Sequence, residues 1–320
     1  TRFHMQLRIA LAFLISLPVF LHAQAPPDTV RIGAFINDIY DINLSDKSFS
    51  AQFWVWFNYA NPELKPLESL EIPNAKSLEY SLEFNEASNG LQWTGKKVTA
   101  VIKKDWDIRR FPFDKQTMTV VLEESDKDVG TMVYAADTEN TKIEPDLTLS
   151  NWEITGFELS AETKRYNTTY GDPSLNTGSE YPRATLNIFI RRKSWGLFFS
   201  LFTGLYVAFF ISSLVFFIDP IDVDPRFGLS VGGLFAAVGN KYIVDSILPQ
   251  STTFTLVDKL HILTYLFLLL CIVLSVISLR IWKNGHERRS ARFDRTSYFI
   301  IVSLYAIINT WLIYSASRGM

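Results

Sequence analysis

The chain is poor in the residues on which disulfide frameworks and metal centres depend. Its 320 residues include one cysteine, Cys271, and four histidines. A single cysteine excludes an internal disulfide, and His261 and His286 are too isolated for a histidine-based metal site. The sequence contains no glycine-rich phosphate loop and no nucleophile motif. It therefore predicts no enzyme and no bound cofactor.

Neither sign of charge is in large excess. The 31 basic residues nearly balance the 33 acidic residues, which argues against nucleic acid as the main partner. Hydropathy divides the chain near residue 192, because a polar, aromatic-rich part is followed by long apolar runs. We expect a domain outside the membrane over residues 26–192 and a membrane domain over residues 193–320.

The first 25 residues read as a secretory signal peptide. Met5 to Ala25 contains Arg8, a short apolar run and an Ala-Gln-Ala end, and residues 1–4 precede it as an upstream remnant. The alternative, a fifth membrane helix, is weakened by Pro18, which interrupts a run of marginal length.

Residues 29–191 contain many short runs of β-branched and aromatic residues separated by turn formers, which predicts an all-β, immunoglobulin-like antiparallel sandwich. The clearest strand is Phe49–Tyr59. Its alternation places Phe53, Val55 and Phe57 on one face, and Trp54 and Trp56 on the other. The second face belongs either to the edge of the same core or to a subunit interface or ligand site.

Two predicted loops carry aromatic residues. In Trp106–Gln116, Pro112 favours an extended Phe111, so we expect the Phe-Pro-Phe tip to project stiffly. The loop of residues 164–182 holds Tyr166, Tyr170 and Tyr181 among small polar residues. These tyrosines are either a lid over a small ligand or ordinary residues of a surface hairpin.

Four apolar segments predict a bundle of membrane helices over about residues 195–218, 227–248, 254–282 and 296–316. Basic residues crowd the link between the third and fourth: Lys283, Arg288, Arg289, Arg292 and Arg295. An excess of lysine and arginine in a loop between membrane helices predicts that this loop lies in the cytoplasm. With four crossings, the C-terminus then lies on the same side as the exported domain, in agreement with a signal peptide.

The second of these segments is unusual for a helix that faces lipid. At helical spacing one face holds five glycine or aromatic positions between acidic ends: Asp224, Gly228, Gly232, Phe235, Gly239, Tyr242 and Asp245. Repeated around an axis, this face would line a pore with acidic rings at both mouths and a constriction of Phe235 between them. The alternative is a tightly packed helix whose glycines allow close approach to a neighbour.

The order of these elements resembles a known family. The tract FPFDKQ (Phe111–Gln116), the run IRRKSW (Ile190–Trp195) leading into the first membrane helix, the Leu248-Pro249 end of the second helix and four helices after a sandwich are similar to a pentameric ligand-gated ion channel. The chain resembles the bacterial branch. Lys104 and Met118 stand where animal receptors have a pair of bridged cysteines.

The resemblance implies roles for individual positions. Asp114 and Arg192 would lie together where the two domains meet, and Phe111 and Pro112 would press on the membrane domain beside Pro249. An aromatic side of the ligand site would contain Trp54 and Trp56. The opposing side would contain these residues: Glu124, Ser125, Asp126, Tyr166, Tyr170 and Tyr181.

The acidic cluster around Ser125, where many relatives have an aromatic residue, consists of Glu123, Glu124, Asp126 and Asp128. It either binds an amine or a divalent cation or senses protons, or it is a solvated loop. Asp224 and Asp245 favour cations, whereas Arg226 near the inner mouth opposes them.

We therefore expect a homopentameric channel gated by a small molecule or by protons, surrounded by lipid and permeable to monovalent cations. The expected location is a bacterial inner membrane, with the sandwich and the C-terminus in the periplasm. An anion channel of the same family and a non-conducting membrane-anchored sensor are the alternatives.

Overall fold

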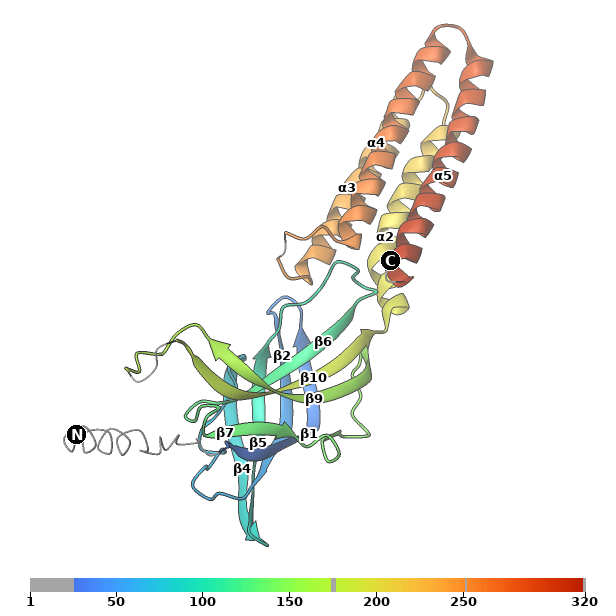
Figure 1. Cartoon of the computed structure of the whole chain (residues 1–320). Coiled ribbons are helices and arrows are strands. Elements are labelled where there is room, and N and C mark those ends of the chain that lie inside the picture. Colours follow the sequence, from blue (N-terminus) through green and yellow to red (C-terminus); the bar gives the residue numbers. More distant parts are fainter. Residues whose placement is uncertain (1–25, 174–176, 251, 319–320) are drawn as a thin grey trace, which may run out of the picture.

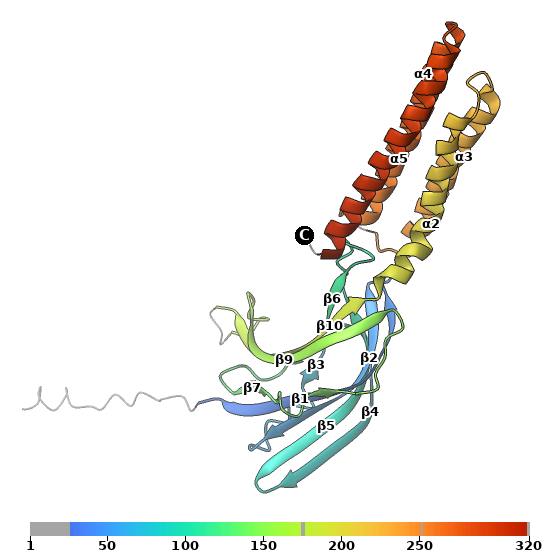
Figure 2. The ribbon, with the colours of Figure 1, turned by 90° about the vertical axis from the view of Figure 1, so that its right-hand side faces the viewer.

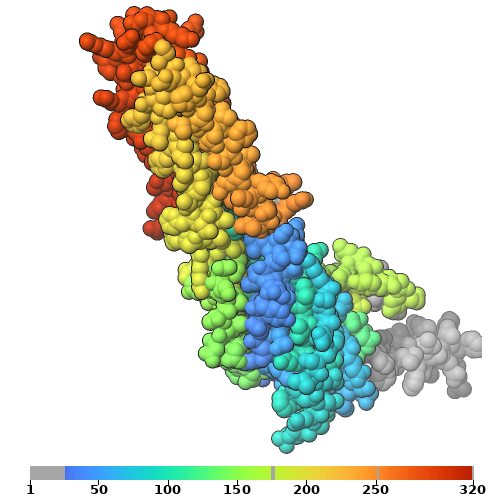
Figure 3. Space-filling model, turned by 180° about the vertical axis from the view of Figure 1, so that it is seen from behind, coloured from blue at the N-terminus to red at the C-terminus, as the bar shows by residue number. Residues whose placement is uncertain are grey.

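The computed structural model describes residues 26–173, 177–250 and 252–318, and it contains a β-sandwich followed by four long helices (Figure 1). Figure 3 shows the two parts joined end to end along an elongated molecule. The fold class predicted from the sequence is confirmed. The predicted signal peptide, residues 1–25, lies outside the described residues.

The sandwich has two sheets with different strand orders. The first has the order β4-β5-β2-β1-β7, with β8 also paired to β1, and the second has the order β3-β6-β10-β9. The pairings are antiparallel except those of β1 with β7 and β8, which are parallel. The strands are β1 (Asp28–Asn43), β2 (Ser48–Tyr59), β3 (Leu70–Glu71), β4 (Ala75–Ser88), β5 (Leu91–Lys103), β6 (Lys115–Glu124), β7 (Met132–Ala136), β8 (Lys142–Ile143), β9 (Trp152–Tyr166) and β10 (Ser179–Arg192).

The alternation along β2 is confirmed. Phe53, Val55 and Phe57 are fully buried between the sheets, whereas Trp54 and Trp56 are half-buried on the other face. Burial of three large side chains from one strand fixes its register, because a shift by one residue would turn all of them outward.

The hairpin of β9 and β10 is longer than predicted. Strand pairing continues to Tyr166 and resumes at Ser179, with Tyr166 opposite Ser179 and Tyr181 opposite Lys164. Much of the predicted loop of residues 164–182 is therefore strand, and residues 174–176 lie outside the described part. The polar composition that suggested a loop instead reflects a hairpin that extends beyond the sandwich core (Figures 1 and 2).

The four helices run alternately away from and towards the sandwich. They are α2 (Ser194–Ser213, continued by the 3-10 turn η1, Leu214–Phe217), α3 (Val223–Ser246), α4 (Leu256–Lys283) and α5 (Glu287–Arg318). Each is long and apolar enough to cross a membrane. In Figure 2, α2 lies beside α3 and α4 lies beside α5, and these are the most extensive helix contacts.

The last helix begins nine residues before its predicted start at residue 296. The highly charged stretch from Glu287 was interpreted as a link because it is not apolar. In the structure it forms the first turns of α5, and one of its faces is packed: Ser290 Oγ donates to the carbonyl oxygen of Ser278 on α4 over 2.9 Å. The turn between α4 and α5 is therefore only residues 284–286.

One glycine of α3 is required by helix packing. A Cβ atom on Gly233 would lie 1.8 Å from the Oγ of Ser212 and 2.8 Å from the carbonyl oxygen of Ala208, both on α2. The adjacent Gly232 has no atom within 4 Å of the same position. Close approach to a neighbouring helix therefore holds at Gly233, whereas Gly232 lies on an open face of α3.

We expect Gly233→Ala to lower the free energy of unfolding by about 1–3 kcal/mol, because the added methyl group overpacks the α2–α3 contact. The control is Gly232→Ala, which adds the same methyl group and the same helix propensity in open space. Thermal unfolding of the purified protein in detergent measures the difference. Equal stability of the two variants would contradict a close α2–α3 contact.

Candidate functional site

The proposed pore face of α3 is turned away from the other helices of its own subunit. All seven predicted residues from Asp224 to Asp245 are exposed, and the exposed fractions of Phe235 and Tyr242 reach 71% and 79%. The opposite side of the helix packs into the bundle through these residues: Arg226, Ser230, Gly233, Ala237 and Val244. An apolar Phe235 and Tyr242 left bare in a single chain are the surface that a central pore or a neighbouring subunit would cover.

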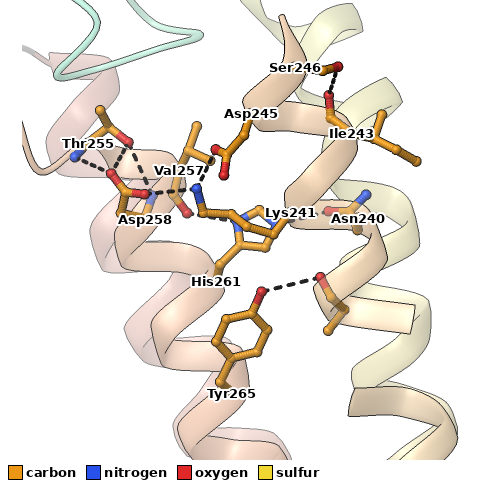
Figure 4. Close-up of polar contacts among 11 residues, drawn as sticks. Asn240, Lys241, Ile243, Asp245, Ser246, Thr255, Val257, Asp258, His261 and Tyr265 are labelled. Atoms are coloured by element: carbon orange, nitrogen blue, oxygen red, sulfur yellow. Dashed lines mark hydrogen bonds and ion pairs between the residues drawn. The ribbon is translucent and has the colours of Figure 1, made fainter. Parts of the chain in front are cut away.

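At the end of α3 near the sandwich, Asp245 is not an isolated acid. Lys241, one turn earlier, forms ion pairs with Asp245 and, over 3.0 Å, with Asp258 at the start of α4 (Figure 4). Asp258 also caps α4, since its Oδ2 accepts hydrogen bonds from the backbone N and the Oγ1 of Thr255. One lysine therefore partly offsets the predicted outer acidic ring, a partnership that the sequence did not reveal.

Below this ion pair, a buried histidine connects three helices. Figure 4 shows His261 of α4 facing Asn240 of α3, with 3.0 Å between Nε2 and the amide oxygen. The Nδ1 atom of His261 lies 2.8 Å from the carbonyl oxygen of Val257, and Asn240 donates to the carbonyl oxygen of Leu201 on α2. These bonds satisfy polar groups that would otherwise be costly inside the bundle.

The structure brings Asp114 and Arg192 together at the junction of the two domains. Arg192 Nε donates to Asp114 Oδ1 over 2.6 Å and Nη2 donates to Oδ2 over 3.0 Å, and both side chains are buried. The guanidinium also lies over the ring of Trp152, 3.8 Å from its centroid, and over Phe111 at 4.9 Å. A bidentate pair between two aromatic rings is a rigid arrangement for a charged side chain.

The prediction that Phe111 projects from its loop is wrong. Phe111 is 2% exposed and Pro112 is also buried, because the chain folds back so that the ring can pack under Arg192. The residue that contacts the membrane domain is Phe113, whose ring lies 5.1 Å from that of Trp195 on α2.

The same loop also touches the start of α4, where Leu256 N donates to the carbonyl oxygen of Arg109 over 2.9 Å. Pro249 is buried close by and, together with Ile108, Lys241 and Asp258, lines a cavity of about 310 Å³. The end of α3, the start of α4 and the sandwich loop thus meet around one small space.

The three predicted tyrosines form a cluster on the β9–β10 hairpin. The ring centroids of Tyr166, Tyr170 and Tyr181 lie 5.7–6.4 Å apart. Tyr166 donates from its hydroxyl to Glu123 Oε1 over 2.6 Å, and Arg183 Nε donates to the other oxygen of Glu123 over 2.5 Å. Burial, and then the hydrogen bond to Glu123, raise the pKa of Tyr166 to about 12, so the phenol stays protonated at neutral pH. Arg183 had no role in the sequence-based site.

The acidic cluster is dispersed among separate partners. Glu124 is fully buried and accepts hydrogen bonds from Ser69 Oγ and from two backbone amides, while Ser125 is exposed. Asp126 pairs with Lys127, and Asp128 accepts from Thr131. Within the described ranges, no three acidic, histidine or cysteine side chains gather as metal ligands. Glu124 therefore organises the loop of Ser125.

The two tryptophans of β2 differ in their surroundings. Trp56 Nε1 donates to the buried Asp137 over 3.3 Å, and its ring occupies the space over Gly33, so Trp56 has structural partners in its own subunit. Trp54 lies beside Phe84 at 5.8 Å. The strand β2 and the tyrosine hairpin belong to different sheets.

Two further acidic residues, which the sequence analysis did not single out, lie beside Asp224. Asp219 and Asp222 are exposed in the turn between η1 and α3, next to the exposed Asp224. The run Asp-Pro-Ile-Asp-Val-Asp (Asp219–Asp224) is the sequence pattern that would have indicated this acidic group. Arg226 does not share this surface, because its side chain is buried in the bundle.

The known proteins that are similar to this chain match most of its length, so the similarity includes both domains. No protein-family model matches the chain. The chain is 20% identical to a proton-gated ion channel of Gloeobacter violaceus, with 90% of this chain and 83% of that protein covered. It is 24% identical to acetylcholine receptor subunit alpha-like 2 of Drosophila melanogaster, with shares of 85% and 51%, and 21% identical to ligand-gated ion channel 4 of Caenorhabditis elegans, with shares of 84% and 45%.

A bacterial channel and animal receptor subunits thus match the same sandwich and the same four helices. These relatives and the fold support membership of the chain in the pentameric ligand-gated ion channel family. It spans about half the length of the animal members that it matches. Its relatives are channels and not enzymes, and its four long apolar helices support a multi-pass membrane protein.

Proposed function

We propose that this chain is the subunit of a homopentameric cation channel whose pore is lined by α3 and which is gated by a small molecule or by protons. The observation that supports this proposal is the exposed stripe of α3. It has acidic residues at both ends and Phe235 between them, and Arg226 is buried on the opposite side. Acidic rings attract cations, and an apolar ring closes a pore by excluding water. Proton gating is the activity named for the Gloeobacter relative.

In this proposal the ligand acts at subunit interfaces, between the tyrosine cluster of one subunit and Trp54 of the next. The signal reaches the pore through the buried Asp114–Arg192 pair and the cavity beside Pro249. A ligand shifts the channel only by the difference in its affinity for the open and closed states.

We further propose that the sandwich and the C-terminus lie in the periplasm and that the basic end of the bundle faces the cytoplasm. The support is the group of basic residues around the turn between α4 and α5, at the end away from the sandwich. The proposed location is a bacterial inner membrane.

The test is the reversal potential of the purified protein in planar bilayers under a KCl gradient. A value near the potassium potential is expected. A value near the chloride potential would keep a channel and overturn the selectivity, whereas protein that forms pentamers but passes no current under acidic or neutral conditions would favour a non-conducting sensor.

We expect Lys241→Gln to raise the single-channel conductance for K⁺ by roughly a factor of two, since it removes a positive charge that offsets Asp245 at the outer mouth. The control is Lys259→Gln, which removes a lysine charge on the neighbouring helix and leaves the described Asp245 contact intact. The gain should diminish at high KCl because salt screens exposed charges. An unchanged conductance would place Asp245 outside the ion path.

A further inference from the structure

The charge of Arg226 is held inside the bundle by three other segments. Its Nε and Nη2 donate to the carbonyl oxygen of Ile218 at the end of η1, over 3.0 and 2.5 Å, and its Nη1 donates to Ser275 Oγ on α4 over 3.2 Å. The counter-charge comes from α5, where Asp294 Oδ2 accepts from Arg226 Nη2 over 2.5 Å. Both charged side chains are almost fully buried.

Arg226 lies close along α3 to the acidic residue of the proposed inner mouth. Arg226 lies in the first turn of α3, two residues after Asp224, so their Cα atoms are about 5.5 Å apart in helical geometry. The two side chains leave opposite sides of the helix, so their charges lie farther apart than their Cα atoms. A positive charge without a counter-charge on this turn would still offset part of the attraction of the acidic ring for cations. Paired with Asp294, Arg226 contributes a neutral unit instead.

Without Asp294, two physical effects act in the same direction. A buried guanidinium that has lost its counter-charge bears a large desolvation cost, and its long side chain can move the charge towards water. The first turn of α3 adjoins the exposed Asp219, Asp222 and Asp224, so the nearest aqueous acids are those of the inner mouth. Arg288, Arg289 and Arg292, in the first turns of α5, are also positive and cannot replace Asp294 as a counter-charge for Arg226.

We propose that Asp294, on the helix farthest along the chain from the pore segment, is a selectivity-determining residue that keeps the Arg226 charge neutral and away from the inner mouth. This inference rests on the proposed cation-channel function. It assigns to α5 a role in ion choice that its sequence, read alone, does not suggest.

The test compares reversal potentials in planar bilayers under a KCl gradient, with every variant in a Phe235→Ala background so that current does not depend on a ligand. Asp294→Asn is expected to lower the ratio of K⁺ to Cl⁻ permeability by on the order of tenfold. The control, Glu287→Gln, removes an exposed acid from the first turn of the same helix and should leave the ratio within about twofold of the parent.

A double-mutant cycle keeps the test decisive if Asp294→Asn alone does not assemble. Arg226→Gln should not lower the permeability ratio, because it removes the positive charge and leaves Asp294 either negative or protonated, and Arg226→Gln with Asp294→Asn should give the parental value. If either variant lowers the ratio well below that of the parent, the Arg226 charge is not what shifts permeation and the proposal is wrong.

The possible failures are distinguishable. A parent channel that reverses near the chloride potential overturns the proposed cation selectivity and the role of Asp294 with it, and assembled wild-type and parent protein that pass no current at neutral or acidic pH refute the proposed channel. A cation-selective parent whose ratio is unchanged by Asp294→Asn refutes only the role of Asp294, and lowered protein yield with an unchanged ratio would identify the pair as purely structural.

Discussion

Phe235→Ala channels are expected to open without ligand, with an open probability at least about tenfold above that of the wild type. Phe235 is the large apolar side chain at the middle of the exposed stripe of α3. Five copies change at once in a homopentamer, so a destabilisation of the closed state by about 0.3 kcal/mol per subunit already shifts the equilibrium tenfold. Loss of five rings widens and wets the constriction, which acts in that direction.

The measurement is single-channel recording of purified protein in planar bilayers with no added ligand. The matched control is Phe227→Ala, the same truncation of an exposed phenylalanine two turns earlier on α3 and outside the stripe. Openings of the control should match those of the wild type. Currents of Phe235→Ala no larger and no more frequent than wild type would remove Phe235 as the gate, although the pore could still be lined by α3.

Asp114→Asn is expected to lower the free energy of unfolding by about 3–5 kcal/mol, because it leaves Arg192 buried without a counter-charge. Trp152 and Phe111 hold the guanidinium from both sides, so it cannot easily reach water. Gln116 Nε2 also donates to Asp114 Oδ2 over 2.8 Å, and the amide of asparagine would replace only part of this network.

Thermal unfolding of the detergent-solubilised protein, followed by size-exclusion chromatography of the pentamer, measures this loss. The control is Glu153→Gln, which breaks the exposed Glu153–Arg191 pair on the neighbouring strands and should cost no more than about 1 kcal/mol. Assembled Asp114→Asn channels should also respond poorly to gating stimuli, because the pair lies where the loop, β10 and α2 meet. Equal stability of the two variants would show that the buried pair is replaceable.

The sequence was most informative where a local period decides which side chains share a face. The stripe from Asp224 to Asp245 follows the helical repeat, and the inward side of β2 follows the strand repeat; in both cases burial in the structure matches the predicted face. The resemblance to the channel family also placed Asp114 near Arg192, 78 residues apart in the chain.

Partnerships between distant residues could not be read in this way. Asp294 was one acid in a basic stretch, and only the folded bundle shows that it meets Arg226, 68 residues earlier. Lys241 joins α3 to α4 through Asp258, and no local pattern in the sequence indicates that contact. Phe111 was expected to project because Pro112 favours an extended backbone, whereas the residue that packs against its ring, Arg192, comes from a distant strand.

The junction between β10 and α2 contains a single residue, Lys193, between Arg192 at the end of the strand and Ser194 at the start of the helix. Such a short junction allows little independent movement. The β9–β10 hairpin and α2 would therefore move together about the buried Arg192. The link from α3 to α4 is longer, spanning residues 247–255. A twist of the sheet that contains β10 would therefore reach α2 directly through the chain and reach α3 only through contacts.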